Sequence, residues 1–382
     1  MSHPLPEDVD PTGQDLRAFT DVLRPQHVAV RNVRGEYVFL RHADVRAIAL
    51  DDATFSSAVS AHLQIPNGLD GAEHTAYRKA LDAFLTPAAL EPYHAAFERI
   101  AAALASELPA HVAIDAVTDI GAVFAVRAQS AWLGWPTALE APLVAWVARN
   151  HEATRSGNRT DMVAVADEFD TLINGLLDAR RGPNGAVIGD DVTAELMRTE
   201  VDGRPLREEE IVSVLRNWTG GDLGSIALCV GVLLYHLAQD APLAARLREG
   251  VPDAEWDAVI NEILRIDDPF VSNRRITTCP VSVGGVALPE GARVKLNWTS
   301  ANRDEAVFGD PDAFEPEGNA QHNLVYGIGR HACPGELLAT LELRIALRAI
   351  LAATTSITLG EETSMREVSP VGGWSDVQVI LA

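Results

Sequence analysis

Residues 326–335 of this chain read Tyr-Gly-Ile-Gly-Arg-His-Ala-Cys-Pro-Gly and run directly into the apolar stretch ELLATLELRIALRAIL. Gly327 and Gly329 suit a tight turn with unusual backbone angles. The pattern predicts a helix from near Cys333 to about Ala353, which places the thiol at a helix start, where backbone N–H groups favour a thiolate. Such a cysteine can be a nucleophile, a metal ligand or a redox sensor. The plainer alternative is a buried cysteine packed at a helix end.

The chain outside this loop is mostly helical in pattern. Apolar residues at helical spacing predict amphipathic helices over 74–86, 88–107, 115–134, 138–152, 161–181 and 253–266. A longer helix is expected over 207–240. Its internal Gly220, Gly221 and Gly224 predict a bend or a close approach by a bulky group, since each internal glycine costs about 1 kcal/mol relative to alanine.

Short strands are expected over 28–40 and 274–299, with further strand-like residues near 376–381. The sequence has no internal repeat and no low-complexity linker. We therefore expect a mainly α protein with a small β-rich subregion, forming one domain over 1–382. Its β-containing part would be about 28–40 and 274–299, and its helical core about 74–266 and 333–353.

Composition and charge limit the possible functions. The 382 residues include 31 Lys and Arg against 54 Asp and Glu, a net charge of −23 that argues against nucleic acids and anionic membranes as partners. The longest apolar run, residues 226–235, is short of the ~18–20 residues that span a bilayer. Three cysteines, Cys229, Cys279 and Cys333, show no paired spacing. A location in a reducing cytoplasm, without a membrane anchor, is expected.

The segment 326–335 resembles the haem-binding loop of the cytochrome P450 superfamily, which reads aromatic, Gly-x-Gly-x, basic, x, Cys, x, Gly. Tyr326 stands where phenylalanine is usual. The resemblance implies a cytochrome P450-like helical fold that binds haem b (iron protoporphyrin IX). Cys333 would be the axial thiolate ligand of the iron. The residues expected to contact the haem from this loop are Tyr326, Gly327, Gly329, His331 and Gly335, with His331 near a propionate.

Three further motifs agree with this resemblance. Glu262 and Arg265 are three apart on one helix and match the family's Glu-x-x-Arg, which implies a buried structural pair; alone, such a pair is usually a solvated salt bridge. His74 and Arg78 lie on one helix face and match a His-x-x-x-Arg that contacts the haem propionates, although a plain polar face reads the same way. Arg275 matches the basic residue that pairs with the other propionate.

The long central helix departs from the family pattern of small residue, Gly, x, acid, Thr. Aligning residues 219–222 keeps the acid, Asp222, but places Leu223 where the threonine belongs. Thr219, Asp222 and Ser225 are spaced by three, so Ser225 is a candidate replacement for the hydroxyl. These three residues are the expected catalytic set. The alternatives are a peroxygenase driven by hydrogen peroxide and a haem-thiolate binding or sensing protein without turnover.

The resemblance implies a monooxygenase that inserts one oxygen atom from O2 by hydroxylation, dealkylation or oxidative coupling. Few charges fall in the expected pocket segments, which indicates a small or medium apolar or aromatic substrate. The chain has no flavin, nicotinamide or iron–sulfur motif, so electrons would come from a separate ferredoxin or flavodoxin-type donor with its reductase. A monomer is expected. The candidate substrate contacts are Trp218, Gly221, Phe270, Val271 and Trp374.

Overall fold

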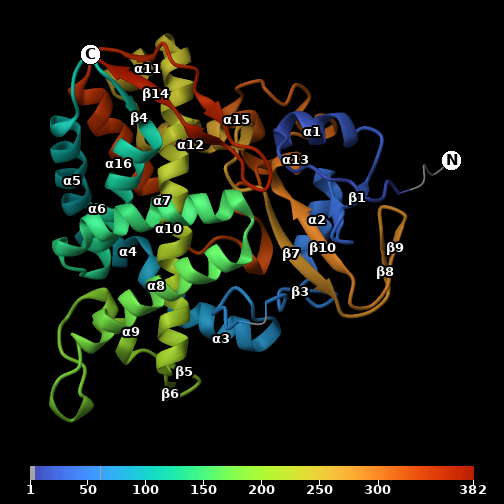
Figure 1. Ribbon diagram of the computed structural model, residues 1–382, viewed down its shortest axis with the longest axis horizontal. Helices are drawn as coiled ribbons and strands as arrows, with labels where there is room; N and C mark the ends of the chain where they lie inside the picture. Colours follow the sequence, from blue (N-terminus) through green and yellow to red (C-terminus); the bar gives the residue numbers. More distant parts are fainter. Residues whose placement is uncertain (1–4, 61) are drawn as a thin grey trace.

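The computed structural model describes residues 5–60 and 62–382. The first four residues of the acidic N-terminal stretch, and Ala61, lie outside the described part. Helices gather on one side of the molecule and the largest sheet lies on the other, with the long helix α10 running through the helical part (Figure 1). The expectation of a mainly α protein with a small β-rich subregion is confirmed.

The helices follow the expected apolar pattern closely. A π-helical segment, Ala116–Ala122, leads into α6, and a 3-10 turn, Asp82–Leu85, follows α3. The α-helices are α1 (Leu16–Leu23), α2 (His42–Leu50), α3 (Gly71–Leu81), α4 (Pro87–Leu90), α5 (His94–Glu107), α6 (Val123–Leu133), α7 (Glu140–Ser156), α8 (Arg159–Asp178), α9 (Val192–Arg198), α10 (Glu208–Gln239), α11 (Ala241–Glu249), α12 (Asp253–Ile266), α13 (Trp298–Ala301), α14 (Glu305–Phe308), α15 (Pro316–Asn319) and α16 (Glu336–Ala353).

Helix α10 is continuous from Glu208 to Gln239, with no break at its glycines. Of Gly220, Gly221 and Gly224, only Gly224 shows the expected close approach: a Cβ atom on it would lie 3.0 Å from His151 Nε2, whereas one on Gly220 or Gly221 would meet nothing within 4 Å. By length and composition α10 could cross a membrane, but 61% of its most apolar window is buried inside the protein. Its apolar surface therefore serves the core.

The largest sheet has the strand order β1-β2-β10-β7-β3. Strands β2 and β10 pair in parallel, with Val294 opposite Tyr37, and the other neighbours in this sheet are antiparallel. Its strands are β1 (Ala29–Arg31), β2 (Tyr37–Phe39), β3 (Phe55–Ser56), β7 (Ser272–Thr277) and β10 (Arg293–Asn297). The remaining strands are β4 (Ala113–Asp115), β5 (Glu200–Val201), β6 (Arg204–Pro205), β8 (Val281–Val283), β9 (Val286–Leu288), β11 (Ile357–Leu359), β12 (Met365–Arg366), β13 (Trp374–Asp376) and β14 (Gln378–Leu381).

Two apolar clusters hold these elements. The larger one unites α5, α6, α10, α12 and α16, and the smaller one packs α2 and α13 on the β1-β2-β10 part of the large sheet. The segment 326–335 follows the large sheet in sequence and precedes α16, so it connects the two clusters. Tyr326 packs on the larger cluster and Ile328 on the smaller one.

Glu262 and Arg265 of α12 form a buried bidentate ion pair, with N–O distances of 2.8 and 2.9 Å. The guanidinium also donates to the carbonyl oxygens of Asn302, Pro311 and Ala313. The carboxylate accepts from the Glu315 backbone N–H and the Asn319 side-chain amide. This pair thereby fixes the segment 302–319, which leads to the cysteine loop.

Replacing Glu262 with alanine leaves the Arg265 guanidinium buried without its counter-ion. The apparent free energy of unfolding should fall by about 3–5 kcal/mol, and the purified protein should carry little haem. Thermal unfolding and the ratio of haem to protein measure both effects. The matched control is Asp178→Ala, which breaks an exposed pair of the same spacing with Arg181. It should cost less than about 1 kcal/mol; equal losses in the two variants would contradict the bracing role.

Candidate active site

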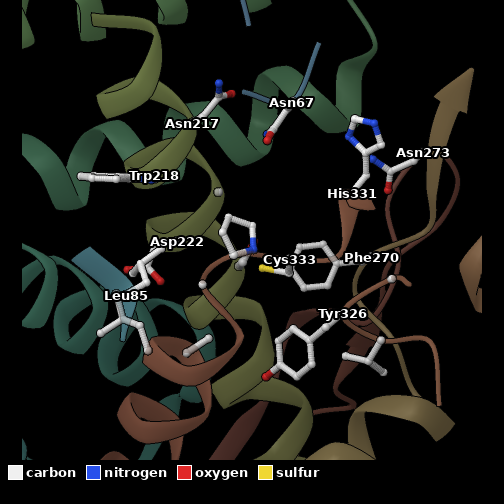
Figure 2. A pocket seen from close by; sticks show the side chains of 18 of the residues that line it. Asn67, Leu85, Asn217, Trp218, Asp222, Phe270, Asn273, Tyr326, His331 and Cys333 are labelled. Carbon is white, nitrogen blue, oxygen red and sulfur yellow. The ribbon is translucent and has the colours of Figure 1, made fainter. Parts of the chain in front are cut away.

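A cavity of about 420 Å³ lies between α10, the segment 326–335 and the start of α16. Cys333 lines one wall and Asp222 of α10 lines another (Figure 2), and Ser225 of α10 also lines the cavity. Side chains from β7 and from the loop before α3 complete the enclosure. The loop residues on the wall are Tyr326, Gly327, Ile328, His331, Cys333, Pro334 and Gly335.

The two glycines of the loop are required by its shape. Gly327 and Gly329 have φ angles of 70° and 77°, which side chains disfavour. A Cβ atom on Gly329 would also lie 2.9 Å from Leu50 Cδ2 in α2. The turn closes with a 2.8 Å hydrogen bond from the Cys333 N–H to the Tyr326 carbonyl. Tyr326, which replaces the usual phenylalanine, has its hydroxyl 3.1 Å from Thr340 Oγ1, so the buried hydroxyl is satisfied.

The helix expected from near Cys333 to about Ala353 is α16, which begins at Glu336, so Cys333 lies three residues before its first turn. Burial raises the pKa of the Cys333 thiol, and the Glu336 carboxylate adds to this, while the Gly335 backbone N–H opposes it. The helix start therefore does not by itself produce a thiolate. A bound metal ion deprotonates a coordinating thiol outright.

Three basic groups gather beside the loop, and among the described residues only His331 has a carboxylate near it, with its Nε2 3.6 Å from Asp70 Oδ1. Arg275 on β7 is 6% exposed and donates to the Arg274 carbonyl, and no carboxylate of the described residues lies within 4.0 Å of its guanidinium. His74 is 1% exposed, and its Nδ1 finds no partner in the part of the chain that the structure describes. The ring of His331 lies 4.2 Å from that of His74, centroid to centroid. Burial lowers the pKa of all three groups, that of His331 to about 4.

Arg78 lines the cavity, but its guanidinium is already engaged. It pairs with Asp82 at 2.8 Å and donates to the carbonyl oxygens of Arg330 and Ala332 in the cysteine loop. Arg330 in turn donates to the Gly71 carbonyl and Thr75 Oγ1 and pairs with Asp52. These bonds fasten the cysteine loop to α3. The arrangement differs from the expected role of Arg78 as a direct ligand of an anion.

Thr219 does not reach the cavity, so its expected place in the catalytic set is wrong. Its side chain is fully buried and its Oγ1 donates to the Leu215 carbonyl at 2.5 Å. A spacing of six residues on an α-helix turns Thr219 roughly 120° away from Ser225. Leu223 packs in the apolar core as well. Position 223, where the family has a threonine, therefore faces away from the cavity in this chain. Ser225 instead presents a hydroxyl to the cavity.

Asp222 presents a carboxyl group to the cavity wall without a hydrogen bond to its Oδ2 from any described residue. Burial raises its pKa to about 7. Glu342 on α16 is fully buried, both of its oxygens lack partners among the described residues, and Asp222 helps raise its pKa. Two neighbouring buried carboxyls cannot both ionise cheaply. Asp222 is thus suited to hold a proton near neutral pH.

Of the residues expected to contact substrate, Trp218, Gly221 and Phe270 line the cavity. The other two, Val271 and Trp374, do not line it. Trp374 donates its indole N–H to Asp267 at 2.8 Å, and its ring packs against that of Tyr235. Its side chain therefore lies in the core. Val271 borders a separate cavity of about 60 Å³ on the other side of the sheet, beside α1.

Sequence reasoning missed several wall residues. On α10 the missed residue is Asn217. The sequence could have predicted it, because positions 217, 218, 221, 222 and 225 lie along one face of a helix. The resemblance implied that segments 56–72 and 269–273 wall the pocket, but which of their residues face it depends on tertiary packing, and helix α6 gave no signal. The missed residues are Asn67, Leu85, Gln129, Trp132, Asn217 and Asn273.

Known proteins are similar to this chain in sequence and in fold. A family model described as Cytochrome P450 matches residues 256–361. The cyclomarin C epoxidase CymV of Salinispora arenicola is 30% identical over 357 residues, covering 88% of each chain. This chain belongs to the cytochrome P450 superfamily. This P450 is also 30% identical over 352 residues to the erythromycin C-12 hydroxylase of Saccharopolyspora erythraea, covering 86% of this chain and 84% of that one.

The architecture agrees with that assignment. A mutant of P450 EryK in complex with erythromycin B superposes with a TM-score of 0.85 at 25% identity, covering 99% of this chain and 98% of that one. The helical fold expected from the cysteine loop is therefore confirmed. The P450 is an oxidoreductase of the monooxygenase type, and its family carries a haem-thiolate cofactor.

Proposed function

We propose that this P450 binds haem b through Cys333 and inserts one oxygen atom into a small or medium organic substrate by hydroxylation, dealkylation or oxidative coupling. One observation carries the proposal: a single cavity is walled by the Cys333 side chain on one side and by Asp222 and Ser225 of α10 on another. A haem whose iron takes a thiolate supplies oxygen activation when it is bound.

The residues around the cavity fit that group. A haem carries two carboxylates, and the buried Arg275 and His74 supply a cation and an imidazole that lack acidic partners within the described chain. His331, whose Nε2 lies 3.6 Å from Asp70 Oδ1, adds a further hydrogen-bonding group. Gly221 and Gly335 leave room on the cavity wall, because neither carries a side chain. Arg78 would hold the cysteine loop in position, since its guanidinium bonds the carbonyls of that loop.

Asp222 and Ser225 would manage protons on the α10 side. Asp222 would hold a proton at its carboxyl group, whose pKa burial raises to about 7, and Ser225 would orient a water or the substrate with its hydroxyl. Trp218, Phe270 and Leu85 would exclude bulk water and pack against the substrate. This arrangement supports use of O2. We further propose that electrons come from a separate ferredoxin or flavodoxin-type donor with its reductase, and that the protein is a monomeric cytoplasmic haem domain.

Two ways of supplying the oxidant, O2 with a reductase system or hydrogen peroxide, test this function. The purified holoprotein is first titrated with aromatic and aliphatic compounds, and the compound giving the largest optical shift is then offered under both regimes. Product formed with O2, NADPH and a ferredoxin–reductase pair supports the proposal. Product formed only with hydrogen peroxide would establish the peroxygenase alternative. A normal thiolate-haem spectrum without product in either regime would establish a binding or sensing protein instead.

Arg275→Leu should weaken haem retention, because it removes a buried cation facing the expected propionate. Charge-assisted hydrogen bonds contribute about 1.5–3 kcal/mol, so haem transfer to excess apo-globin should be roughly 10- to 100-fold faster. Arg274→Leu is the matched control, since Arg274 is exposed and offers Arg275 only its backbone carbonyl. Equal transfer rates for wild type and Arg275→Leu would remove Arg275 from the haem site.

A further inference from the structure

The loop before α3 is fastened to α10 above the cavity. Ser213 Oγ accepts from the Ile65 N–H at 2.8 Å and donates to the Leu63 carbonyl at 3.0 Å. One turn along α10, Asn217 Nδ2 donates to the Ile65 carbonyl at 2.7 Å. These bonds hold residues 63–65 against α10 and thereby fix the position of Asn67, two residues further on. This wall is therefore set before a substrate arrives.

The bond to Ile65 also fixes the orientation of the Asn217 side chain. Since a carbonyl oxygen accepts only, the Asn217 amide must turn its nitrogen toward Ile65. Its Oδ1 makes no hydrogen bond to a described residue and remains a free acceptor on a side chain that lines the cavity. Asn67 lines the same cavity and its side chain makes no hydrogen bond to any described residue. Figure 2 shows both amides on the upper part of the wall, with Trp218 below them. Two carboxamides with free hydrogen-bonding capacity thus face an otherwise mainly apolar space.

The unbonded atoms of the two amides determine which chemical group of a substrate can bind there. An acceptor on Asn217 requires an N–H or O–H donor, and Asn67 can donate to a neighbouring carbonyl oxygen. A carboxylate is disfavoured because Asn217 would meet it with an oxygen. Asp222 lies five residues further along α10, about 7.5 Å along the helix axis, so the amides contact a part of the substrate away from the reacting end.

We propose that Asn217 and Asn67 form a polar subsite for a neutral amide-type group, with Asn217 Oδ1 accepting from its N–H and Asn67 donating to its carbonyl oxygen. The inference rests on the proposed function, because it names the substrate class of the same cavity. It narrows the expectation of a small or medium apolar or aromatic substrate to one with an apolar body and a neutral hydrogen-bonding end. A site built to bond a donor strongly rejects the analogue that lacks it.

Calorimetric titration of the holoprotein with 2-quinolinone and its N-methyl derivative tests the subsite. The two ligands differ in the N–H group that Asn217 would bind. Wild type should bind the N–H ligand at least about tenfold more tightly, since one hydrogen bond contributes roughly this factor. Asn217→Leu should reduce the preference to less than about threefold. Asn67→Ala should weaken both ligands by a similar factor and keep the preference, because both retain the carbonyl group.

Ser213→Ala is the matched control, since it loosens the loop without changing either amide. It should preserve the preference for the N–H ligand. The subsite is overturned if wild type does not discriminate, if the preference survives in Asn217→Leu, or if Ser213→Ala abolishes it equally. Calorimetry reads binding without turnover, so a preference seen in a protein that makes no product would refute the proposed function and leave the subsite standing.

Discussion

Cys333→Ser is expected to abolish both the thiolate-haem spectrum and product formation. The serine hydroxyl keeps the size of the side chain but is a poor iron ligand, and it cannot supply the electron density that a thiolate gives to iron. The ferrous–carbon monoxide difference spectrum should lose its thiolate band completely. Product formation should fall to the level of a control reaction that contains no substrate. The loop itself should survive, because its closing bond runs from the backbone N–H of residue 333 to the Tyr326 carbonyl.

The two other cysteines are the controls for this result. Cys279→Ser changes an exposed residue outside the cavity and should leave spectrum and turnover unchanged. Cys229→Ser is the stricter control, because Cys229 is buried on α10 and also lines the cavity. It should cost stability and keep the thiolate band. A band that persists in Cys333→Ser, or that disappears in Cys229→Ser alone, would assign the ligand to a different sulfur.

The sequence was most informative where a local geometric requirement acts on few residues. Gly327 and Gly329 are needed for positive φ angles within one turn, and the motif preserves that requirement without reference to the remainder of the fold. Glu262 and Arg265 are likewise neighbours on one helix, so their spacing already predicts that they can pair. Their burial could be inferred only by resemblance, because it depends on the segment 302–319 folding over them.

The α10 positions show what the sequence could not supply. Residues three apart on a helix lie near one another, but each interval of three residues rotates the side-chain direction by roughly 60°. Two such intervals lie between Thr219 and Ser225, so their side chains point in different directions. Which part of that arc faces the cavity is decided by the packing of α6 and α16 around α10. The glycines show the same limit: Gly121 and Gly231 permit close contact between α10 and the π-helical segment 116–122, whereas a Cβ atom on Gly220 or Gly221 would meet nothing within 4 Å and the helix is unbroken there.

Asp222→Asn should lower turnover with O2 and a reductase by about 10²–10⁴-fold at pH 7, the usual contribution of a positioned acid. Asparagine keeps the shape of the side chain but holds no transferable proton. Because burial raises the pKa of Asp222 to about 7, the wild-type carboxyl is protonated below that pH and loses its proton above it. A group acting as an acid therefore gives a rate that falls as the pH rises through about 7. That step should be absent from the pH profile of Asp222→Asn.

Thr219→Val and Ser225→Ala separate the acid from its neighbours on α10. Thr219 bonds only the Leu215 carbonyl and is turned from the cavity, so Thr219→Val should keep both the rate and the pH step. Ser225→Ala should lower the rate and retain the pH step, since the hydroxyl orients a proton that Asp222 holds. An unchanged rate in Asp222→Asn, or a pH step that persists in it, would show that another group supplies the proton. The buried Glu342, whose pKa is raised beside Asp222, would be the next residue to replace.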